Sequence, residues 1–226
     1  MRMTPDLAGV NIVLTGRFNP AIFQPAWFAH VGLFSAKEAE SAEVQVIHKE
    51  VSSFRMDWLS FRAEPERITF ETTEEPFIRL SEFVVRLFRE FLPHTPLSAM
   101  GINLQAHFPV DFDRRERLGL ALAPRDVWGE WGKRTQMGKD ARHGGLISIT
   151  LIENELDDRP TGSFRITVEP SRRIKVGIYM ASNDHYALSD ATAPGSAGQL
   201  MDLLEKSFEP SIKKTEEIFD HLLGQL

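Results

Sequence analysis

Apolar and polar residues alternate along several short segments of the chain, and this period-two pattern predicts β-strands with one buried face. The longest example is 100–108, where every second residue from Met100 to Phe108 is apolar and the residues between them are small or polar. The same alternation, or a short β-branched run, predicts strands over 10–14, 43–48, 54–60, 68–72, 147–151, 164–168 and 174–180. The last three strands, joined by short turns, are typical of an antiparallel meander.

Two segments have the periodicity of amphipathic helices. Over 77–92, apolar residues recur at three- and four-residue intervals, charged residues occupy the opposite side, and Pro93 ends the segment. The C-terminal segment 197–224 carries a drifting apolar stripe, which we expect Pro210 to kink or to divide into two helices. The small and polar residues over 35–42 predict a surface loop instead.

This order of elements predicts an α+β protein. We expect a mostly antiparallel sheet, built as one sheet, as two sheets or as two similar halves, packed by the amphipathic helices at 77–92 and 197–224. The predicted organisation is an N-terminal α+β half over 1–110, an irregular and partly mobile connection over 111–145, and a meander with a C-terminal helix over 146–226. With 226 residues, the chain fits one domain or two small coupled ones.

The stretch RFNPAIFQPAWF, residues 17–28, combines five large apolar side chains with two prolines, which begin and restart a short broken helix. Successive helical residues are about 100° apart, so these side chains cannot all face one core. We expect Phe23 or Trp27 to contact a protein partner, while Ile22 and Phe28 point into the fold, because exposed aromatic clusters are typical of interfaces. The alternative is that the whole stretch is a core plug.

Composition narrows the class of protein. The apolar fraction of 42% and the charged fraction of 26% are those of a folded globular protein. The chain has no cysteine, which excludes disulfides and thiolate metal sites and favours a reducing cytoplasm.

We find no signal-peptide pattern and no run of roughly 18 apolar residues that could cross a membrane. The net charge of -6 disfavours bulk binding to nucleic acid or anionic lipid. The expectation is a cytoplasmic protein without membrane contact.

Acidic residues at two predicted strand ends are the strongest candidates for metal chemistry. Asp111 and Asp113 follow the strand at 100–108, and Glu153 and Glu155 end the first strand of the meander. Carboxylates of this kind hold divalent cations in hydrolases and nucleases, although solvated charges at strand ends are the commoner explanation. No cofactor is predicted, because dinucleotide, P-loop, nucleophile-elbow and paired-histidine motifs are absent from the sequence.

Two groups of basic residues would form a cationic spot for nucleic acid if the fold brings them together. They are Arg114, Arg115, Arg117, Arg172, Arg173 and Lys175. Trp128 and Trp131, in a short predicted helix, would then stack on bases. Because the net charge is acidic, base stacking is the less favoured role of the two tryptophans. The alternative is that they anchor a protein interface.

The preferred interpretation is a non-catalytic cytoplasmic interaction protein, which is a subunit of a larger assembly or a homo-oligomer. It depends on the lack of a catalytic signature and on the aromatic residues Phe23, Trp27, Trp128 and Trp131, which we expect at interfaces. A metal-dependent hydrolase or nuclease that uses the acidic residues is the first alternative. A small-molecule sensor that binds between the sheet and the loop at 124–145 is the second.

Overall fold

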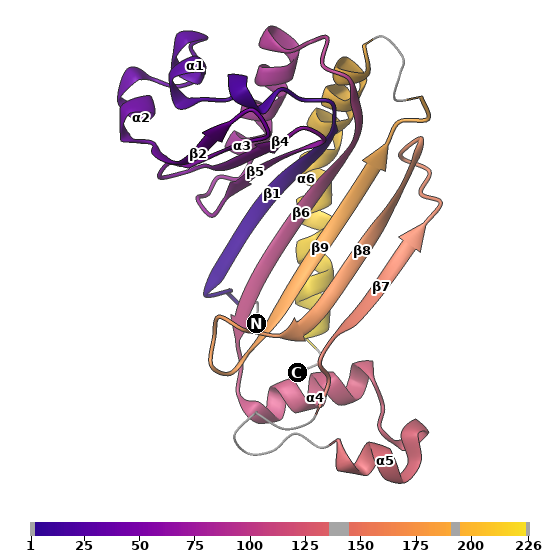
Figure 1. The fold of residues 1–226 in the computed structure, drawn as a ribbon. Coiled ribbons are helices and arrows are strands. Elements are labelled where there is room, and N and C mark those ends of the chain that lie inside the picture. The colour runs from indigo at the N-terminus through magenta and orange to yellow at the C-terminus, as the bar shows by residue number, and fades with distance from the viewer. Residues whose placement is uncertain (1–2, 136–144, 191–194, 225–226) are drawn as a thin grey trace.

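The strands of the protein form one nine-stranded antiparallel sheet, shown in the computed structural model of Figure 1. The structure describes residues 3–135, 145–190 and 195–224. Across the sheet the strand order is β2-β3-β4-β5-β1-β6-β9-β8-β7. The strands are β1 Leu7–Gly16, β2 Glu43–His48, β3 Val51–Arg55, β4 Ser60–Glu64, β5 Arg67–Thr72, β6 Leu97–Pro109, β7 Ile149–Asn154, β8 Thr161–Pro170 and β9 Gly177–Ala187.

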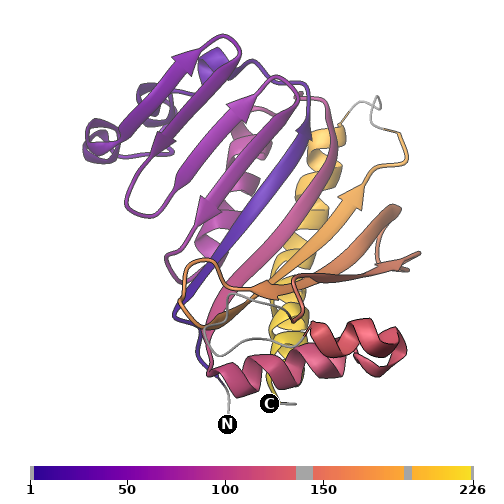
Figure 2. The same ribbon diagram turned by 60° about the horizontal axis from the view of Figure 1, so that its bottom comes forward.

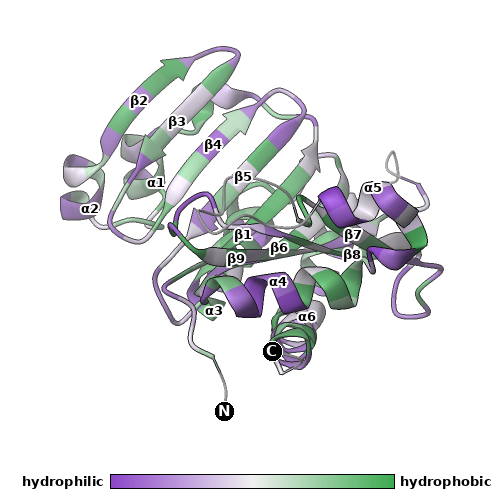
Figure 3. Ribbon diagram, turned by 90° about the horizontal axis from the view of Figure 1, so that it is seen from below, coloured by the Kyte–Doolittle hydropathy of each residue, from purple (hydrophilic) through white to green (hydrophobic). Residues whose placement is uncertain are grey.

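Two helices, α3 Ile78–Arg86 and α6 Ser196–Leu223, cover one face of this sheet. The others are η1 Pro20–Ile22, α1 Pro25–His30, α2 Ala36–Ser41, the π-helical turn η2 Leu87–Phe91, α4 Phe112–Leu122, η3 Asp126–Trp128 and α5 Gly129–Arg134. α3 and the long α6 run side by side behind the sheet in Figure 2, and both lie on the same side of it in Figure 3. The predicted α+β class, with helices on a largely antiparallel sheet, is confirmed.

β1 and β6 join the two parts of the chain in a single sheet. β1 pairs with β5, where Val10 lies opposite Thr72, and with β6, where Val10 lies opposite Leu104. β6 pairs on its other edge with β9, where Phe108 lies opposite Ile178. Because β6 forms backbone ladders on both edges, the alternative of two separate sheets is wrong.

The alternation along β6 separates the two faces as predicted. Met100, Ile102, Leu104, Ala106 and Phe108 are at most 4% exposed and pack in the core. The residues between them point to the opposite face, which no helix of the described residues covers at its centre (Figure 2). We call this opposite face the open face, and it is where the polar half of the alternating pattern lies.

RFNPAIFQPAWF forms two short helices, η1 and α1, and fills one end of the helical layer. Phe28 is fully buried, and its ring centroid lies 4.8 Å from that of Phe34, 5.5 Å from that of Phe61 and 5.8 Å from that of Phe83. These rings come from β4, from α3 and from the turn after α1, so the stretch covers the β3–β5 part of the sheet. Aromatic rings at these separations add edge-to-face and stacked contacts to the area that they bury.

Local interactions overturn two of the loop and strand predictions. Residues 35–42 contain helix α2, because the Ser35 hydroxyl accepts from the Glu38 backbone N–H and the Glu38 carboxylate accepts from the Ser35 backbone N–H, a capping box. The single strand expected over 54–60 is broken by a turn, in which the Met56 backbone N–H donates to the Leu59 carbonyl over 2.8 Å.

Later segments also differ from the prediction. The connection over 111–145 contains α4, η3 and α5, and residues 136–144 lie outside the described part of the chain. β9 begins at Gly177 and continues to Ala187, beyond the strand predicted over 174–180. Pro210 lies inside α6 without dividing it, although proline removes one backbone donor.

The aromatic cluster predicts a large effect of truncating its central ring. We expect Phe28→Ala to lower the free energy of unfolding by about 3–5 kcal/mol, because the lost ring leaves a cavity among several other rings. Chemical denaturation checks this value. The control is Val44→Ala, at a position that is 48% exposed, which should change stability by less than about 0.5 kcal/mol. A loss below about 1 kcal/mol for Phe28→Ala would contradict this account of the core.

Candidate functional site

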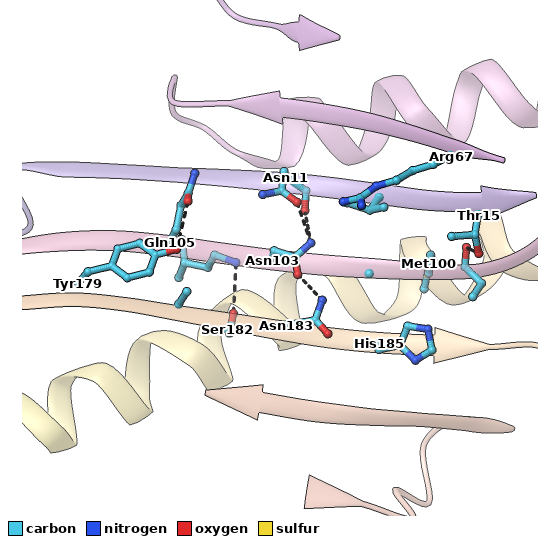
Figure 4. A pocket seen from close by; sticks show the side chains of 15 residues that line it. Asn11, Thr15, Arg67, Met100, Asn103, Gln105, Tyr179, Ser182, Asn183 and His185 are labelled. Carbon is cyan, nitrogen blue, oxygen red and sulfur yellow. Dashed lines mark hydrogen bonds between the residues drawn. The ribbon is translucent and has the colours of Figure 1, made fainter. Parts of the chain in front are cut away.

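The open face carries a polar hollow at the centre of the sheet, over β1, β6 and β9 (Figure 4). Its volume is about 450 Å³, which is within the usual range for small-molecule sites. Its polar and charged lining residues are Asn11, Thr15, Arg67, Asn103, Gln105, Tyr179, Ser182, Asn183 and His185. None of the lining residues is acidic. We take this hollow as the candidate site, because polar side chains from several strands converge in it.

Three asparagines form a hydrogen-bonded row across the hollow. The Asn103 side-chain amide donates to Asn11 Oδ1 over 2.7 Å, and the Asn183 amide donates to Asn103 Oδ1 over 2.5 Å. The row follows from the register, since Asn11 lies opposite Asn103 on β1 and β6. Each amide orients the next, so the row is a fixed set of polar groups on the open face.

The backbone ladder between β6 and β9 is interrupted under this row. The strands pair up to Ile102 opposite Asp184 and again from Gln105 opposite Ala181. Between these pairs the Leu104 backbone N–H donates to the Ser182 hydroxyl over 3.2 Å. A buried serine hydroxyl therefore replaces a strand partner at the floor of the hollow, which keeps the backbone donor satisfied.

Gly101 lets the side chains of Asn103 and Asn183 lie close to the backbone of β6. It lies opposite Val13 on β1 and opposite His185 on β9. A Cβ atom at this position would lie 3.2 Å from Asn183 Nδ2 and 3.5 Å from Asn103 Nδ2. Glycine in a strand interior often marks a place where another group approaches the backbone closely.

Burial sets the charge of the titratable groups around the hollow. Burial lowers the pKa of the His185 imidazole, and the guanidinium groups of Arg159 and Arg165 lower it further. Burial, together with the nearby carboxylates of Glu169 and Glu71, raises the pKa of the Tyr179 hydroxyl. Both groups are therefore neutral near pH 7 and act as hydrogen-bonding groups there.

A buried ion pair packs against β9 on the helix side of the sheet. The Arg159 guanidinium donates to Asp184 and, over 2.6 Å, to Asp158, and it lies 3.8 Å from the centre of the Tyr186 ring. Burial opposes the charge of Arg159, but its hydrogen bonds to Asp158 and Asp184 outweigh this and raise the pKa of the guanidinium. The Tyr186 hydroxyl donates to Asp184 over 3.1 Å. We assign this cluster a structural role, because Arg159 and Asp184 are buried on the helix side of the sheet.

The aromatic residues predicted at interfaces lie in two different environments. Phe23 is only 1% exposed and sits at the end of η1 against Phe61, so the expectation that it contacts a partner is wrong for this fold. Trp27 is half-buried at the rim of the same cluster. Trp128 and Trp131 are 59% and 55% exposed, with ring centroids 5.5 Å apart. Only this second pair has the exposure of an interface anchor.

The acidic residues do not converge on one site. Asp111 caps α4 by accepting from the Arg114 backbone N–H over 2.7 Å, and Asp113 lies in the first turn of the same helix. Glu153 lies on β7 and pairs with Lys214 of α6 over 3.0 Å, while Glu155 follows β7. No group of three or more metal-ligating side chains is placed to hold an ion within the described ranges.

The two basic groups lie at the same end of the sheet. Pro109, just before α4, pairs with Gly177, just after the turn that carries Arg172, Arg173 and Lys175. On α4, Arg114 pairs with Asp111 over 3.7 Å, Arg115 lines a narrow crevice beside β8, and Arg117 also has an interaction partner. The turn residues are exposed, whereas the helix residues interact within the protein. Contact with nucleic acid therefore stays a prediction.

The residues that build the hollow were not predicted as site residues. Asn103 belongs to the polar half of the 100–108 alternation, which was visible, but Asn11 and Asn183 are 92 and 80 residues away from it in the chain. Only the pairing of β1, β6 and β9 aligns the three. Gly101, inside an otherwise regular strand pattern, was the one local signal.

No protein-family model matches this chain, and no curated protein matches it in sequence. Among the described helices, none is long and apolar enough to cross a membrane. Function is therefore inferred from the surfaces of the structure.

The buried ion pair predicts that Asp184 is important for stability. Asp184→Ala should lower the free energy of unfolding by about 3–5 kcal/mol, because the buried Arg159 charge loses a carboxylate partner. Chemical denaturation measures the change. The control is Asp157→Ala, at an exposed position in the turn that carries Arg159. It should change stability by less than about 0.5 kcal/mol. Equal effects of the two substitutions would contradict the assigned role.

The two histidines on the open face predict a pH-dependent stability. Burial lowers the pKa of both His107 and His185, so the folded protein binds their protons less tightly than the unfolded chain does. Their contribution is complete above the unfolded histidine pKa of about 6.5 and is lost as the pH falls below it. We expect the melting temperature to drop between pH 7.5 and about pH 5.5, and to drop less in a His107→Gln, His185→Gln variant. An equal drop in both proteins would assign the effect to other groups.

Proposed function

We propose that the protein is a non-catalytic assembly subunit, and that it self-associates through the free edge of β7. The observation that carries this proposal is the exposure of apolar side chains on both faces of this edge strand. Leu151, on the helix side, is 68% exposed, and Ile152, on the open face, is 50% exposed. Ile147, just before the strand, is 79% exposed.

The edge of β7 lacks the features that normally prevent strands from pairing with other chains. Edge strands are usually blunted by lysine, by proline or by a bulge. β7 contains neither residue, and its register with β8 is continuous from Ile149 to Asn154. The opposite edge strand, β2, has an irregular register between Val44 and Val46, which makes it a poorer template.

The geometry of β7 suits a second copy of the same chain as the partner. A two-fold axis perpendicular to the sheet pairs identical edges in antiparallel orientation and keeps the helical layers of both copies on one side. Residues directly opposite each other must then share a face, so Ile152 can lie opposite its own copy, with Leu151 opposite Glu153. This register places apolar side chains together and no like charges opposite each other, which favours pairing.

The exposed tryptophan pair extends this surface. α5 lies near the β7 end of the sheet in Figures 1 and 3, and Val127, Trp128 and Trp131 are all more than half exposed. Large aromatic side chains are enriched among the residues that dominate interface energies. An apolar strand edge beside an exposed aromatic pair supports self-association at this side of the molecule.

The test is the oligomeric state, measured by size-exclusion chromatography with light scattering. We expect a dimer at about 100 μM protein, and we expect Ile152→Lys to make the protein monomeric, because a charge at the centre of the edge opposes pairing. The matched control is Ile47→Lys on the opposite edge strand, a position that is 40% exposed, and it should leave the dimer intact. Trp128→Ala with Trp131→Ala should weaken the dimer, and in the monomeric Ile152→Lys background the same two substitutions should not lower the melting temperature. A monomeric wild-type protein, or a dimer that Ile152→Lys does not affect, would refute the proposal.

A further inference from the structure

We propose that the hollow on the open face is a binding site for a small organic anion that carries a carboxylate or a phosphate group together with a hydroxyl group. This proposal is independent of self-association, because the hollow lies over β1, β6 and β9 in the middle of the sheet, with β8 between it and the β7 edge. Three features support it, namely a cation without a partner among the described residues, hydrogen-bonding groups that the described residues leave unused, and a glycine that places the asparagine donors at the floor of the hollow.

The cation is Arg67, at the start of β5. It is the only arginine or lysine that lines the hollow, and it forms no hydrogen bond or ion pair with any described residue. In contrast, the neighbouring open-face residue Arg62 pairs with Glu64 over 2.6 Å. No carboxylate lines the hollow, and Glu64, which lies opposite Arg67 in the β4–β5 ladder, pairs with Arg62. A guanidinium group over an uncharged polar surface favours carboxylate or phosphate, which it can bind with two parallel hydrogen bonds.

The asparagine row supplies further hydrogen-bonding groups for such a ligand. Asn183 Nδ2 uses one of its two N–H groups on Asn103 and keeps the other. Asn11 Nδ2 has no acceptor in the part of the chain that the structure describes, and its N–H groups are available next to Arg67 (Figure 4). At the other end of the row, Asn183 Oδ1 accepts no hydrogen bond from a described residue. Donors near the cation and an acceptor further along suit an anion that also carries a hydroxyl group.

Gly101 makes room for the asparagine donors at the floor of the hollow. Both asparagine Nδ2 atoms lie within 3.5 Å of the position where a Cβ atom would be, so even a small side chain here would crowd the donors. Glycine weakens a strand interior because it packs no side chain, and at the centre of the sheet it allows the Asn103 and Asn183 side chains to lie close to the backbone of β6. The Thr15 hydroxyl and the His185 imidazole border the same space.

NMR titration of the ¹⁵N-labelled protein tests the proposal, because the asparagine side-chain amides give their own signals. The probes are ribose 5-phosphate and citrate, and glucose is the uncharged control of similar size. We expect saturable shifts of Asn11, Asn103 and Asn183 signals with at least one anion at up to about 10 mM, and none with glucose. A response to ribose 5-phosphate alone identifies phosphate as the recognised group, and a response to citrate alone identifies carboxylate. No saturable shift with either anion, or an equal shift with glucose, would overturn the proposal.

Two variants show whether the shifts come from this site. Arg67→Gln should weaken binding about tenfold, because it removes the only strong cation, while Arg62→Gln on the same face should leave the affinity unchanged. Gly101→Val should abolish binding by displacing the Asn103 and Asn183 donors, with the melting temperature as a check on folding. If Arg67→Gln and Arg62→Gln weaken binding equally, the anion is held by general charge and the proposal is wrong. If Gly101→Val does not fold, the comparison of the two arginine variants decides the question.

Discussion

The backbone pairing of β6 with its two neighbours is the interaction on which the rest of the structure depends. β6 is the longest strand, from Leu97 to Pro109, and it connects the N-terminal strands through β1 with the C-terminal strands through β9. These pairings bring together segments that are far apart in the chain. Without them, α3 and α6 would not share one face, and the asparagine row would not exist.

A sheet with helices on one face only has two surfaces with opposite requirements. The covered face is filled with aliphatic and aromatic side chains, and the burial of this area is the main source of stability. The open face keeps polar side chains, and several of them satisfy one another, as in the pairs Asn103–Asn11 and Gln105–Glu71. Arg67 and the ends of the asparagine row are exceptions, because no described residue pairs with them. Their polar groups remain available to a ligand in the hollow.

The two proposed surfaces lie in different parts of the sheet and depend on different physics. The β7 edge exposes apolar side chains and unpaired backbone groups, and it suits another protein chain. The hollow exposes a cation and amide groups over a depression, and it suits a small polar molecule. β8 separates the two, so that occupancy of one leaves the other accessible. An assembly subunit that also binds a metabolite-sized anion is consistent with both.

The sequence by itself determined most of the elements, because periodicity and proline positions are local signals: the strand at 100–108, the helix at 77–92 and the polar side of β6 all follow from them. It also contained the Ser35–Glu38 capping box, a local signal that the prediction missed. Only the tertiary structure decided that Phe23 is buried, since one ring cannot be assigned to core or surface before its neighbours Phe28 and Phe61 are placed. The structure alone also decided the candidate site, because the alignment of three asparagines depends on strand register, and register is a long-range property that no local pattern of residues specifies.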